Sequence, residues 1–380
     1  MSNTEIKFST DGWHAKLNEL FTEENLLRIA QAYVLFLKQK NIHVQPVAVG
    51  YDGRKNSKQY AELFSSVLSG NKIPVLLSQE ILPTPVLSFA VKKFQCSAGV
   101  MITAGNHPGK YNGIKFKASY GGPFIGDEIK TIEKFTNTVQ EIPRSTFHIT
   151  PQDFLPPYKE HLQTIVNVDL LREYAAKPAN NPNVMIDSMG GAGKTILEDI
   201  LVECGWRAQT IFGTPEPNFY DRNPETIEEN LQPLMYNTGI TDAILGIATD
   251  GDGGGCAICN ENGKWVSVQQ TILLLAWHLY KNKNLRGAII KSVPVTDRLR
   301  LLAEKRNLPF FEVNVSFQNI TRVMLQNECL VGADDSAGFS VHGHIPERDG
   351  ILSGLLFCEM LAQSGKSVDE IWKEIENEIG

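Results

Sequence analysis

The sequence of 380 residues lacks the features that mark membrane, secreted and nucleic-acid-binding proteins. No apolar run reaches the length of about 20 residues that spans a bilayer, and the start, MSNTEIKFSTDGW, has neither the basic nor the apolar region of a secretory signal. The formal net charge is -7, whereas nucleic acids and anionic membranes favour a basic surface. We therefore expect a cytoplasmic protein without nucleic-acid or membrane partners.

Cysteine is scarce as well, with 6 residues scattered through apolar segments. Cys256 and Cys259 have the spacing of a zinc-binding pair, but no second cysteine pair or nearby histidine pair completes a set of four ligands. The sequence thus predicts reduced thiols in the core.

Apolar strands alternate with amphipathic helices along the chain. The pattern predicts three cycles of a strand followed by a helix, at 47–50 and 58–68, at 184–187 and 195–204, and at 288–292 and 298–305. A proline-bearing segment at 152–157 predicts a boundary, followed by one helix at 158–174. Such alternation is typical of parallel α/β layers.

One loop has the character of an active site. The apolar run Val100 to Ile102 ends in the small and polar residues TAGNHPG at 103–109, which suit a strand end followed by a tight turn, and YNGIK follows at 111–115. This stretch closely resembles the nucleophile loop of the α-D-phosphohexomutases, the phosphoglucomutase and phosphomannomutase family, which reads T-A-S-H-N-P and then Y-N-G-I-K. The serine that carries the phosphoryl group in that family is Gly105 here, and glycine has no oxygen to phosphorylate.

The resemblance extends along almost the whole chain. Matching motifs are TDGW at 10–13, GYDGR at 50–54, ATDGDG at 248–253 and HIPERDGI at 344–351. They imply an α/β protein of three consecutive α/β/α domains, which we expect at 1–155, 156–262 and 263–380. A fourth, C-terminal phosphate-binding domain of the family is expected to be absent.

The resemblance also implies a metal site with the pattern D-x-D-x-D-R. Asp250 and Asp252 match its first two aspartates, but Gly254 and Gly255 replace the third aspartate and the arginine. Two carboxylates can still hold Mg²⁺ weakly. Alternatively, Asp250 and Asp252 only form turns in a glycine-rich loop.

The family's sugar-binding loop, G-E-E-S-G, is similar to GADDSAG at 332–338, which contains Asp334, Asp335 and Ser336. The retained basic residues that we expect near a ligand phosphate are Arg54, Lys115 and Arg348, with surface salt bridges as the alternative interpretation. Asn106 and His107 are further expected ligand contacts, in a loop whose H-N order is inverted relative to the family.

These losses predict a phosphohexomutase-like protein of carbohydrate metabolism that binds a hexose phosphate without mutase activity. It would act as a sensor, a regulator or an assembly partner, alone or as a homo-oligomer. An alternative is an active phosphotransferase that uses Mg²⁺ and a different phosphoacceptor, His107 or Thr103.

A third interpretation concerns SMGGAGKT at Ser188 to Thr195, between a predicted strand and a predicted helix. This is the setting of a P-loop, G-x-x-x-x-G-K-[ST], which binds nucleotide phosphates. Its first glycine is replaced by Ser188, and the phosphohexomutases have a similar D-P-M-x-G-A-G segment here. A turn that leads into the helix is therefore the preferred interpretation.

Overall fold

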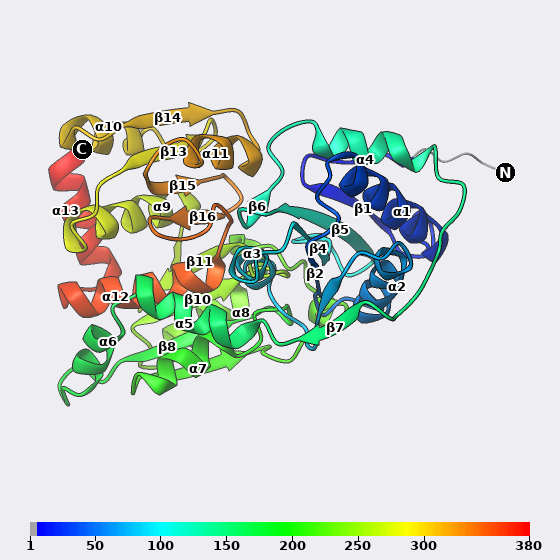
Figure 1. The fold of residues 1–380 in the computed structure, drawn as a ribbon. Coiled ribbons are helices and arrows are strands. Elements are labelled where there is room, and N and C mark those ends of the chain that lie inside the picture. The colour runs from blue at the N-terminus through cyan, green and yellow to red at the C-terminus, as the bar shows by residue number, and fades with distance from the viewer. Residues whose placement is uncertain (1–5) are drawn as a thin grey trace.

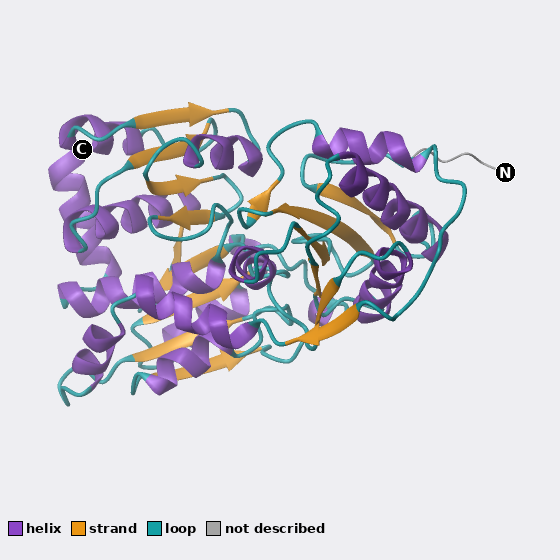
Figure 2. Ribbon diagram, in the orientation of Figure 1, coloured by secondary structure: helices purple, strands orange, loops and turns teal. Residues whose placement is uncertain are grey.

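The computed structural model describes residues 6–380 and forms three sheets from them, each packed against helices (Figure 1). Figure 2 shows that the first sheet lies on one side of the molecule and the other two sheets lie together on the other side. The loops between them meet at the centre of the molecule, which is where the candidate site is found.

The first domain has a seven-stranded sheet in the order β1-β5-β4-β2-β3-β7, with β6 paired to β5. Its strands are β1 (Gly12–Lys16), β2 (Val47–Tyr51), β3 (Val75–Ser78), β4 (Ala98–Ile102), β5 (Tyr111–Ala118), β6 (Gly122–Pro123) and β7 (Ile149–Gln152). Its helices are α1 (Glu23–Gln39), α2 (Ser57–Gly70), α3 (Thr84–Lys93) and α4 (Glu128–Thr136).

The second domain has a five-stranded sheet in the order β12-β11-β10-β8-β9. Its strands are β8 (Asn183–Asp187), β9 (Arg207–Ile211), β10 (Leu245–Thr249), β11 (Cys256–Asn260) and β12 (Trp265–Val266). Its helices are α5 (Leu155–Ile165), α6 (Val168–Ala175), α7 (Ile196–Glu203) and α8 (Gln232–Ile240), with short 3-10 turns at Phe219–Asp221 and Glu228–Asn230.

The third domain has a four-stranded sheet in the order β14-β13-β15-β16. Its strands are β13 (Ala288–Ser292), β14 (Phe310–Val313), β15 (Cys329–Ala333) and β16 (Phe339–Val341). Its helices are α9 (Val268–Trp277), which continues into a π-turn at His278–Asn282, α10 (Arg298–Arg306), α11 (Phe317–Met324), α12 (Gly350–Ser364) and α13 (Val368–Ile379).

The three sheets share one strand topology. In each sheet the first strand of the unit lies between the second and the third, parallel to both, as in β3-β2-β4, β9-β8-β10 and β14-β13-β15. A short loop then joins the third strand to a fourth, antiparallel one, as in β4-β5, β10-β11 and β15-β16. The three α/β units expected from the sequence are confirmed, but the sheets are mixed rather than parallel, because a short hairpin can join only antiparallel strands.

The predicted single helix at 158–174 is wrong. Val166 has an extended backbone, with ψ of 136°, and this ends α5. The side chain of Asn167 accepts a hydrogen bond from Leu170 N at 3.0 Å and begins α6. An asparagine at such a position satisfies a backbone N–H that the first turn of a helix leaves free.

Helix α12 joins the domains. It follows the third sheet in the chain, yet it contacts α6, α7, β10 and β11 of the second domain. Every residue from Gly350 to Ala362 is buried, and α12 belongs to a hydrophobic cluster that extends from Ala48 in the first domain to Ile379. Since this helix is apolar all round, it needs cover on every side, and two domains supply it.

Two further expectations concern the cysteines and the membrane. All six cysteines are buried and free, including Cys256 and Cys259 on β11, as the sequence predicts. None of the helices described within residues 6–380 is long and apolar enough to cross a bilayer.

Candidate functional site

The three loops that join each third strand to its antiparallel partner converge. The backbone of Gly251, in the loop after β10, approaches the carbonyl of Gly105, in the loop after β4. Gly255 and Gly338 form an isolated bridge between the loops after β10 and β15. The repeated topology therefore brings one loop from each domain to a common centre.

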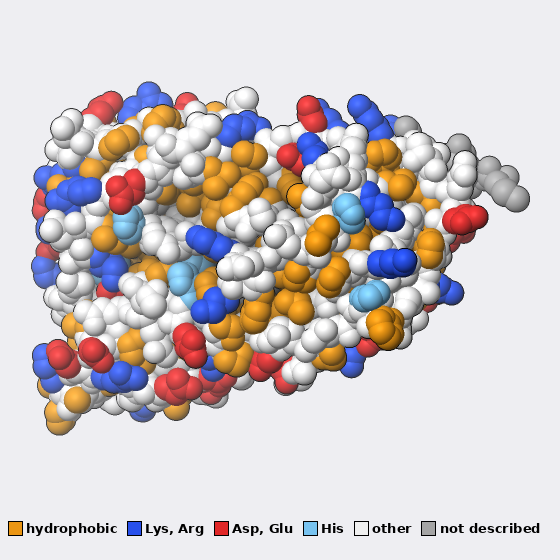
Figure 3. All heavy atoms as spheres, viewed as in Figure 1, with side chains coloured by type: hydrophobic (Ala, Val, Ile, Leu, Met, Phe, Trp, Pro, Cys, Tyr) orange, Lys and Arg blue, Asp and Glu red, His pale blue; other side chains and the backbone are white. Residues whose placement is uncertain are grey.

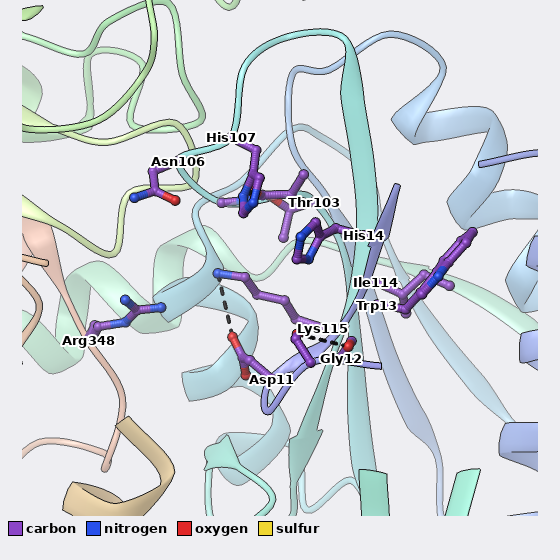
Figure 4. A pocket seen from close by; sticks show the side chains of 13 residues that line it. Asp11, Gly12, Trp13, His14, Thr103, Asn106, His107, Ile114, Lys115 and Arg348 are labelled. Carbon is purple, nitrogen blue, oxygen red and sulfur yellow. Dashed lines mark hydrogen bonds and ion pairs between the residues drawn. The ribbon is translucent and has the colours of Figure 1, made fainter. Parts of the chain in front are cut away.

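A cavity of about 160 Å³ opens at this centre (Figure 4). A neighbouring hollow of about 200 Å³ shares Asp11 and Arg348 with it. Predicted site residues that line the cavity are Thr103, Gly105, Asn106, His107, Lys115 and Arg348. Those that line the neighbouring hollow are Asp334, Asp335 and Ser336. The structure thus brings together the residues expected from the loop motifs of the first and third domains.

The pairing of β1 with β5 positions the basic side of the cavity. Gly12 is paired with Lys115 and His14 with Gly113 in this antiparallel ladder. Because alternate residues of a strand share a face, Lys115 and Lys117 point to the same side of β5. Figure 4 shows Lys115 extending from the strand toward Asp11, with His14 beside it.

Arg54 holds the loop of residues 103–110 rather than a ligand. Its guanidinium donates to Asp52 Oδ2 at 3.0 Å and to four carbonyl oxygens, those of Gly105, His107, Pro108 and Tyr111, at 2.6 to 3.1 Å. A guanidinium has five N–H donors, and these contacts use all of them. The prediction that Arg54 binds a ligand phosphate is therefore wrong, since only 3% of this residue is exposed and no donor remains for a phosphate.

Lys115 lies in a cluster of carboxylates. Its Nζ donates to Asp252 Oδ2 at 2.8 Å and lies 3.6 Å from Asp11 Oδ2. Burial by itself would lower the pKa of Lys115, but Asp252 and Asp11 outweigh this effect and raise it. Lys115 therefore remains an ammonium ion at neutral pH.

The two aspartates of the second-domain loop have opposite environments. Burial raises the pKa of Asp252, but Lys115 and the hydroxyl of Thr84, which donates to Asp252 Oδ2 at 2.6 Å, outweigh it and hold the pKa well below its ordinary value. Asp250 has a buried Oδ1 without a hydrogen-bond partner, and burial, together with the charge of Asp252, raises its pKa to about 6. Asp252 is thus firmly ionised, whereas Asp250 takes up a proton as the pH falls through about 6.

These residues do not fit the divalent cation that the sequence motif implies. Asp252 Oδ2 already accepts hydrogen bonds from Lys115 and Thr84. Among residues 6–380, no group of three or more histidine, cysteine, aspartate or glutamate side chains is arranged to hold a metal ion. Mg²⁺ is usually bound by one or two carboxylates together with waters, but here Lys115 and Thr84 already occupy Asp252 Oδ2, so the prediction of Asp250 and Asp252 as a weak metal site is not supported by their contacts.

Two histidines form another side of the cavity. The rings of His14 and His107 lie 4.1 Å apart, and His107 Nδ1 donates to the carbonyl of Ala104 at 2.9 Å. Burial lowers the pKa of both imidazoles, and their mutual repulsion adds to this effect for His14. Both rings are therefore neutral at pH 7 in the free protein.

The side chains of the other two loop residues take part in the loop structure. Thr103 Oγ1 accepts from Gly105 N at 3.0 Å, and Asn106 Nδ2 donates to Glu225 Oε1 at 3.4 Å. Thr103 is buried, whereas Asn106 is partly exposed at the edge of the cavity. Asn106 thus combines a contact to the second domain with access to the cavity.

The third domain contributes Arg348 through a loosely held side chain. Its Nη1 lies 3.4 Å from Asp334 Oδ2 and 3.3 Å from Ser336 Oγ, which is longer than the 2.7 to 2.9 Å of a strong charge-assisted hydrogen bond. Its Nε is buried without a hydrogen-bond partner. Asp334 Oδ1, in contrast, accepts from the backbone N–H groups of Ser336 and Gly338, so it shapes its own loop.

The stretch Ser188 to Thr195 is a turn that leads into α7. Met189 N donates to Asp187 Oδ1, and the amides of Gly190, Gly191 and Ala192 donate to backbone carbonyls at 2.7 to 3.0 Å. Lys194 forms an ion pair with Glu80 at 3.0 Å. The P-loop interpretation is therefore not supported, because these four amides are bonded to the protein and the Lys194 ammonium is paired with Glu80.

A larger hollow of about 510 Å³ lies apart from the cavity, between α3, α5 and the segment before α12. Lysine and histidine side chains gather over this part of the surface (Figure 3). His161 stacks on Phe89 at 4.5 Å, and its Nε2 lies 3.1 Å from His344 Nδ1. Because burial lowers the pKa of His161 to about 4, its ring is neutral at pH 7.

Sequence reasoning missed four residues of the central cluster, namely Asp11, Thr84, Lys117 and Glu347. Lys117 Nζ is buried 2.7 Å from Glu347 Oε2 and 3.5 Å from Asp11 Oδ1. The alternation of Lys115 and Lys117 along β5 was a usable signal, since it places two ammonium groups on one face. Asp11 and Glu347 lie within the motifs at 10–13 and 344–351, which was a second usable signal, whereas the partner of Thr84 lies far away in the sequence.

Comparisons with known proteins agree with this geometry. Residues 5–143, 156–263 and 268–378 match the α/β/α domains I, II and III of phosphoglucomutase/phosphomannomutase, respectively. A phosphoglucomutase/phosphomannomutase of Thermococcus kodakarensis is 26% identical over 372 residues, which cover 97% of this chain and 80% of the relative. A phosphoglucosamine mutase of Carboxydothermus hydrogenoformans is 25% identical over 97% of this chain and 82% of its own length.

Solved structures extend the likeness. A Thermus thermophilus protein classed with the phosphomannomutases is 31% identical, with a TM-score of 0.91 over 99% of this chain and 84% of its own. An Aspergillus fumigatus N-acetylphosphoglucosamine mutase, solved with GlcNAc-6P and magnesium, has a TM-score of 0.59 at 12% identity, over 97% of this chain and 79% of its own. At that identity the second match is evidence for the fold alone.

The contacts of Arg54 predict a large loss of stability for Arg54→Met. Removing one partner of a buried, hydrogen-bonded pair costs about 3 to 5 kcal/mol, whereas Arg207→Met, which breaks an exposed pair with Asp242, should cost at most about 1 kcal/mol. Urea denaturation measures both, and hydrogen exchange should show faster exchange at residues 104–111 in Arg54→Met alone. Equal, small effects of the two variants would contradict the proposed anchoring role.

The different environments of Asp250 and Asp252 predict that replacing each by asparagine will change Tm in opposite directions. A raised pKa in the folded protein means that Asp250 contributes stability only at low pH and loses it as the pH rises through about 6. Asp250→Asn should therefore raise Tm at pH 7.5 by a few degrees and change it little at pH 4.5. Asp252→Asn should lower Tm at both pH values, because the lowered pKa of Asp252 makes its ionised form stabilising throughout this range. Thermal melts at the two pH values test this, and shifts of the same sign at pH 7.5 would refute it.

Proposed function

Since the chain belongs to the phosphoglucomutase/phosphomannomutase family of α-D-phosphohexomutases, we propose that its central cavity binds a hexose phosphate but does not transfer the phosphoryl group. The protein would then act in carbohydrate metabolism as a sensor, a regulator or an assembly partner. The observation that carries this proposal is the environment of Gly105, at the position where the family has its phosphorylated serine.

Besides lacking a hydroxyl group, Gly105 has a backbone conformation and a neighbouring lysine that disfavour a serine at this position. Its φ is +60°, a left-handed conformation that side-chain-bearing residues rarely adopt. A Cβ at this position would lie 3.1 Å from Lys115 Nζ and 3.5 Å from Lys115 Cε. The backbone at position 105 thus has a conformation that favours glycine, and the Lys115 side chain lies where a side chain at position 105 would begin.

Sugar-phosphate binding is supported by the groups that still face the cavity. Arg348 is held only by long contacts, so its guanidinium is available to a phosphate, and hydrogen bonds of this charged kind contribute roughly 1.5 to 3 kcal/mol each. In the neighbouring hollow, Asp335 and Ser336 are exposed and able to bond sugar hydroxyls. A hexose phosphate therefore fits the chemistry of the two adjoining hollows.

A second candidate function is phosphoryl transfer through His107. The hydrogen bond from His107 Nδ1 to the Ala104 carbonyl leaves Nε2 with its lone pair, and the lowered pKa keeps the ring neutral. A neutral, oriented imidazole is a competent nucleophile. Phosphohistidine found by mass spectrometry after incubation with a sugar bisphosphate, and lost in His107→Ala, would favour this candidate over the first.

The main test separates binding from turnover. With Mg²⁺ and a bisphosphate activator, the purified protein should not interconvert the 1- and 6-phosphates of glucose or mannose, and Gly105→Ser should not restore turnover. Hexose phosphates should nevertheless raise Tm, because a ligand that binds only the folded state stabilises it. Turnover comparable with that of a true mutase would refute the loss of activity, and the absence of any thermal shift would refute the binding.

Arg348→Met provides a test of the site itself. Loss of one charge-assisted phosphate contact should weaken the binding of glucose 6-phosphate by at least about 10-fold in calorimetry. The matched control is Arg300→Met on α10, whose guanidinium pairs with Glu312 outside both hollows. Equal affinities of the two variants would exclude Arg348 from the site.

A further inference from the structure

The ammonium group of Lys115 occupies the centre of the carboxylate cluster. It contacts Asp252 at 2.8 Å and Asp11 at 3.6 Å, and 14% of its side chain is exposed. These carboxylates come from two domains, one from the segment before β1 and the other from the loop after β10. The lysine therefore provides positive charge where the loops of the first and second domains meet.

The ammonium group of Lys115 lies next to Gly105. The space next to Gly105 that a side chain would fill is bordered by Lys115 Nζ at 3.1 Å and by Asp252 Oδ1 at 3.9 Å. The lysine and the aspartate of the implied metal motif thus lie side by side, next to the missing phosphoacceptor. One ammonium ion and one divalent cation would compete for the same carboxylate.

We propose that Lys115 is the resident cation of this site, in place of a divalent metal ion, and that the cavity binds its phosphate without metal. The first part concerns the protein alone, and the second part rests on the proposed function. The contacts with Lys115 and Thr84 give Asp252 a structural role even though Gly254 and Gly255 replace the last two residues of the metal motif.

The contacts around Asp252 explain why metal is excluded. A metal ion bound at Asp252 Oδ2 would have to displace both the Lys115 ammonium and the Thr84 hydroxyl. It would also lie within a few ångströms of a positive charge, and at an effective dielectric constant of about 20 the repulsion of such charges is large enough to weaken metal binding by orders of magnitude.

The other lysine on the same face of β5, Lys117, does not contact Asp252. Lys117 is fully buried against Glu347, so its charge is neutralised by the third domain and does not reach the loop after β10. Lys115 alone forms an ion pair with Asp252 among the described residues. Removing the Lys115 ammonium should therefore release the carboxylate for a metal ion.

The experiment measures Mn²⁺ binding at pH 7.5 without any sugar phosphate, by electron paramagnetic resonance of free Mn²⁺ and by calorimetry. The proteins are the wild type, Lys115→Met, Lys115→Gln and the double variant Lys115→Met with Asp252→Asn. We expect no site in the wild type below millimolar Mn²⁺, a gain in affinity of at least about 10-fold in both single variants, and loss of that gain in the double variant.

Two results would overturn the proposal. One is a Mn²⁺ site in the wild type with sub-millimolar affinity that Asp252→Asn removes. The other is the failure of both folded single variants to gain affinity. If neither single variant folds, the wild-type measurement still decides, because a site for Mn²⁺ at Asp252 is incompatible with a resident ammonium ion.

A second arm tests metal-free phosphate binding. The thermal shift of the wild type with glucose 6-phosphate should be the same in EDTA as in Mg²⁺, and a shift that appears only with Mg²⁺ would contradict this part of the proposal. Absence of a shift under both conditions would instead contradict the proposed function. The Mn²⁺ measurement, which uses no sugar phosphate, would then still decide the role of Lys115 by itself.

Discussion

Two lysines on one strand join the three domains at their centre. Lys115 forms an ion pair with Asp252 of the second domain, Lys117 forms one with Glu347 of the third, and both lie near Asp11 of the first. Buried charges are tolerated only when they are paired and hydrogen-bonded. The two ion pairs therefore fix the segments that carry Asp252 and Glu347 against β5. The shape of the cavity depends on this network, because Asp11, Lys115 and the neighbouring Arg348 line it.

The network is possible because one topology occurs three times. In each domain the third strand turns back through a short loop into an antiparallel partner, and the three loops then converge. Helix α12 fixes this arrangement, since it belongs to the third domain in sequence and packs against the second in space. Arg54 performs the equivalent task within the first domain, where its five donors hold the loop of residues 103–110.

The same architecture is compatible with the proposed loss of phosphoryl transfer in a scaffold that would still bind a ligand. The backbone of each loop is stabilised by contacts outside the cavity, such as those of Arg54, Asp334 and Thr84. Among the residues that face the cavity, Gly105 differs from the family motif, whereas Lys115 matches it. The proposed loss of a nucleophile at position 105 would therefore leave the loop backbones and Arg348 in place.

The sequence and the tertiary structure determine different properties of this protein. The motifs and the alternation of strands and helices were sufficient for the family, for three α/β units and for six of the 13 residues that line the cavity, because these depend on local spacing and on similarity. Three features could not be obtained in this way: the burial of Arg54 against four carbonyls, the contrast between Asp250 and Asp252, and the position of Lys115 among carboxylates. Each depends on which groups from distant segments become neighbours, and the charge state and bonding of a side chain are set by those neighbours rather than by its place in the chain.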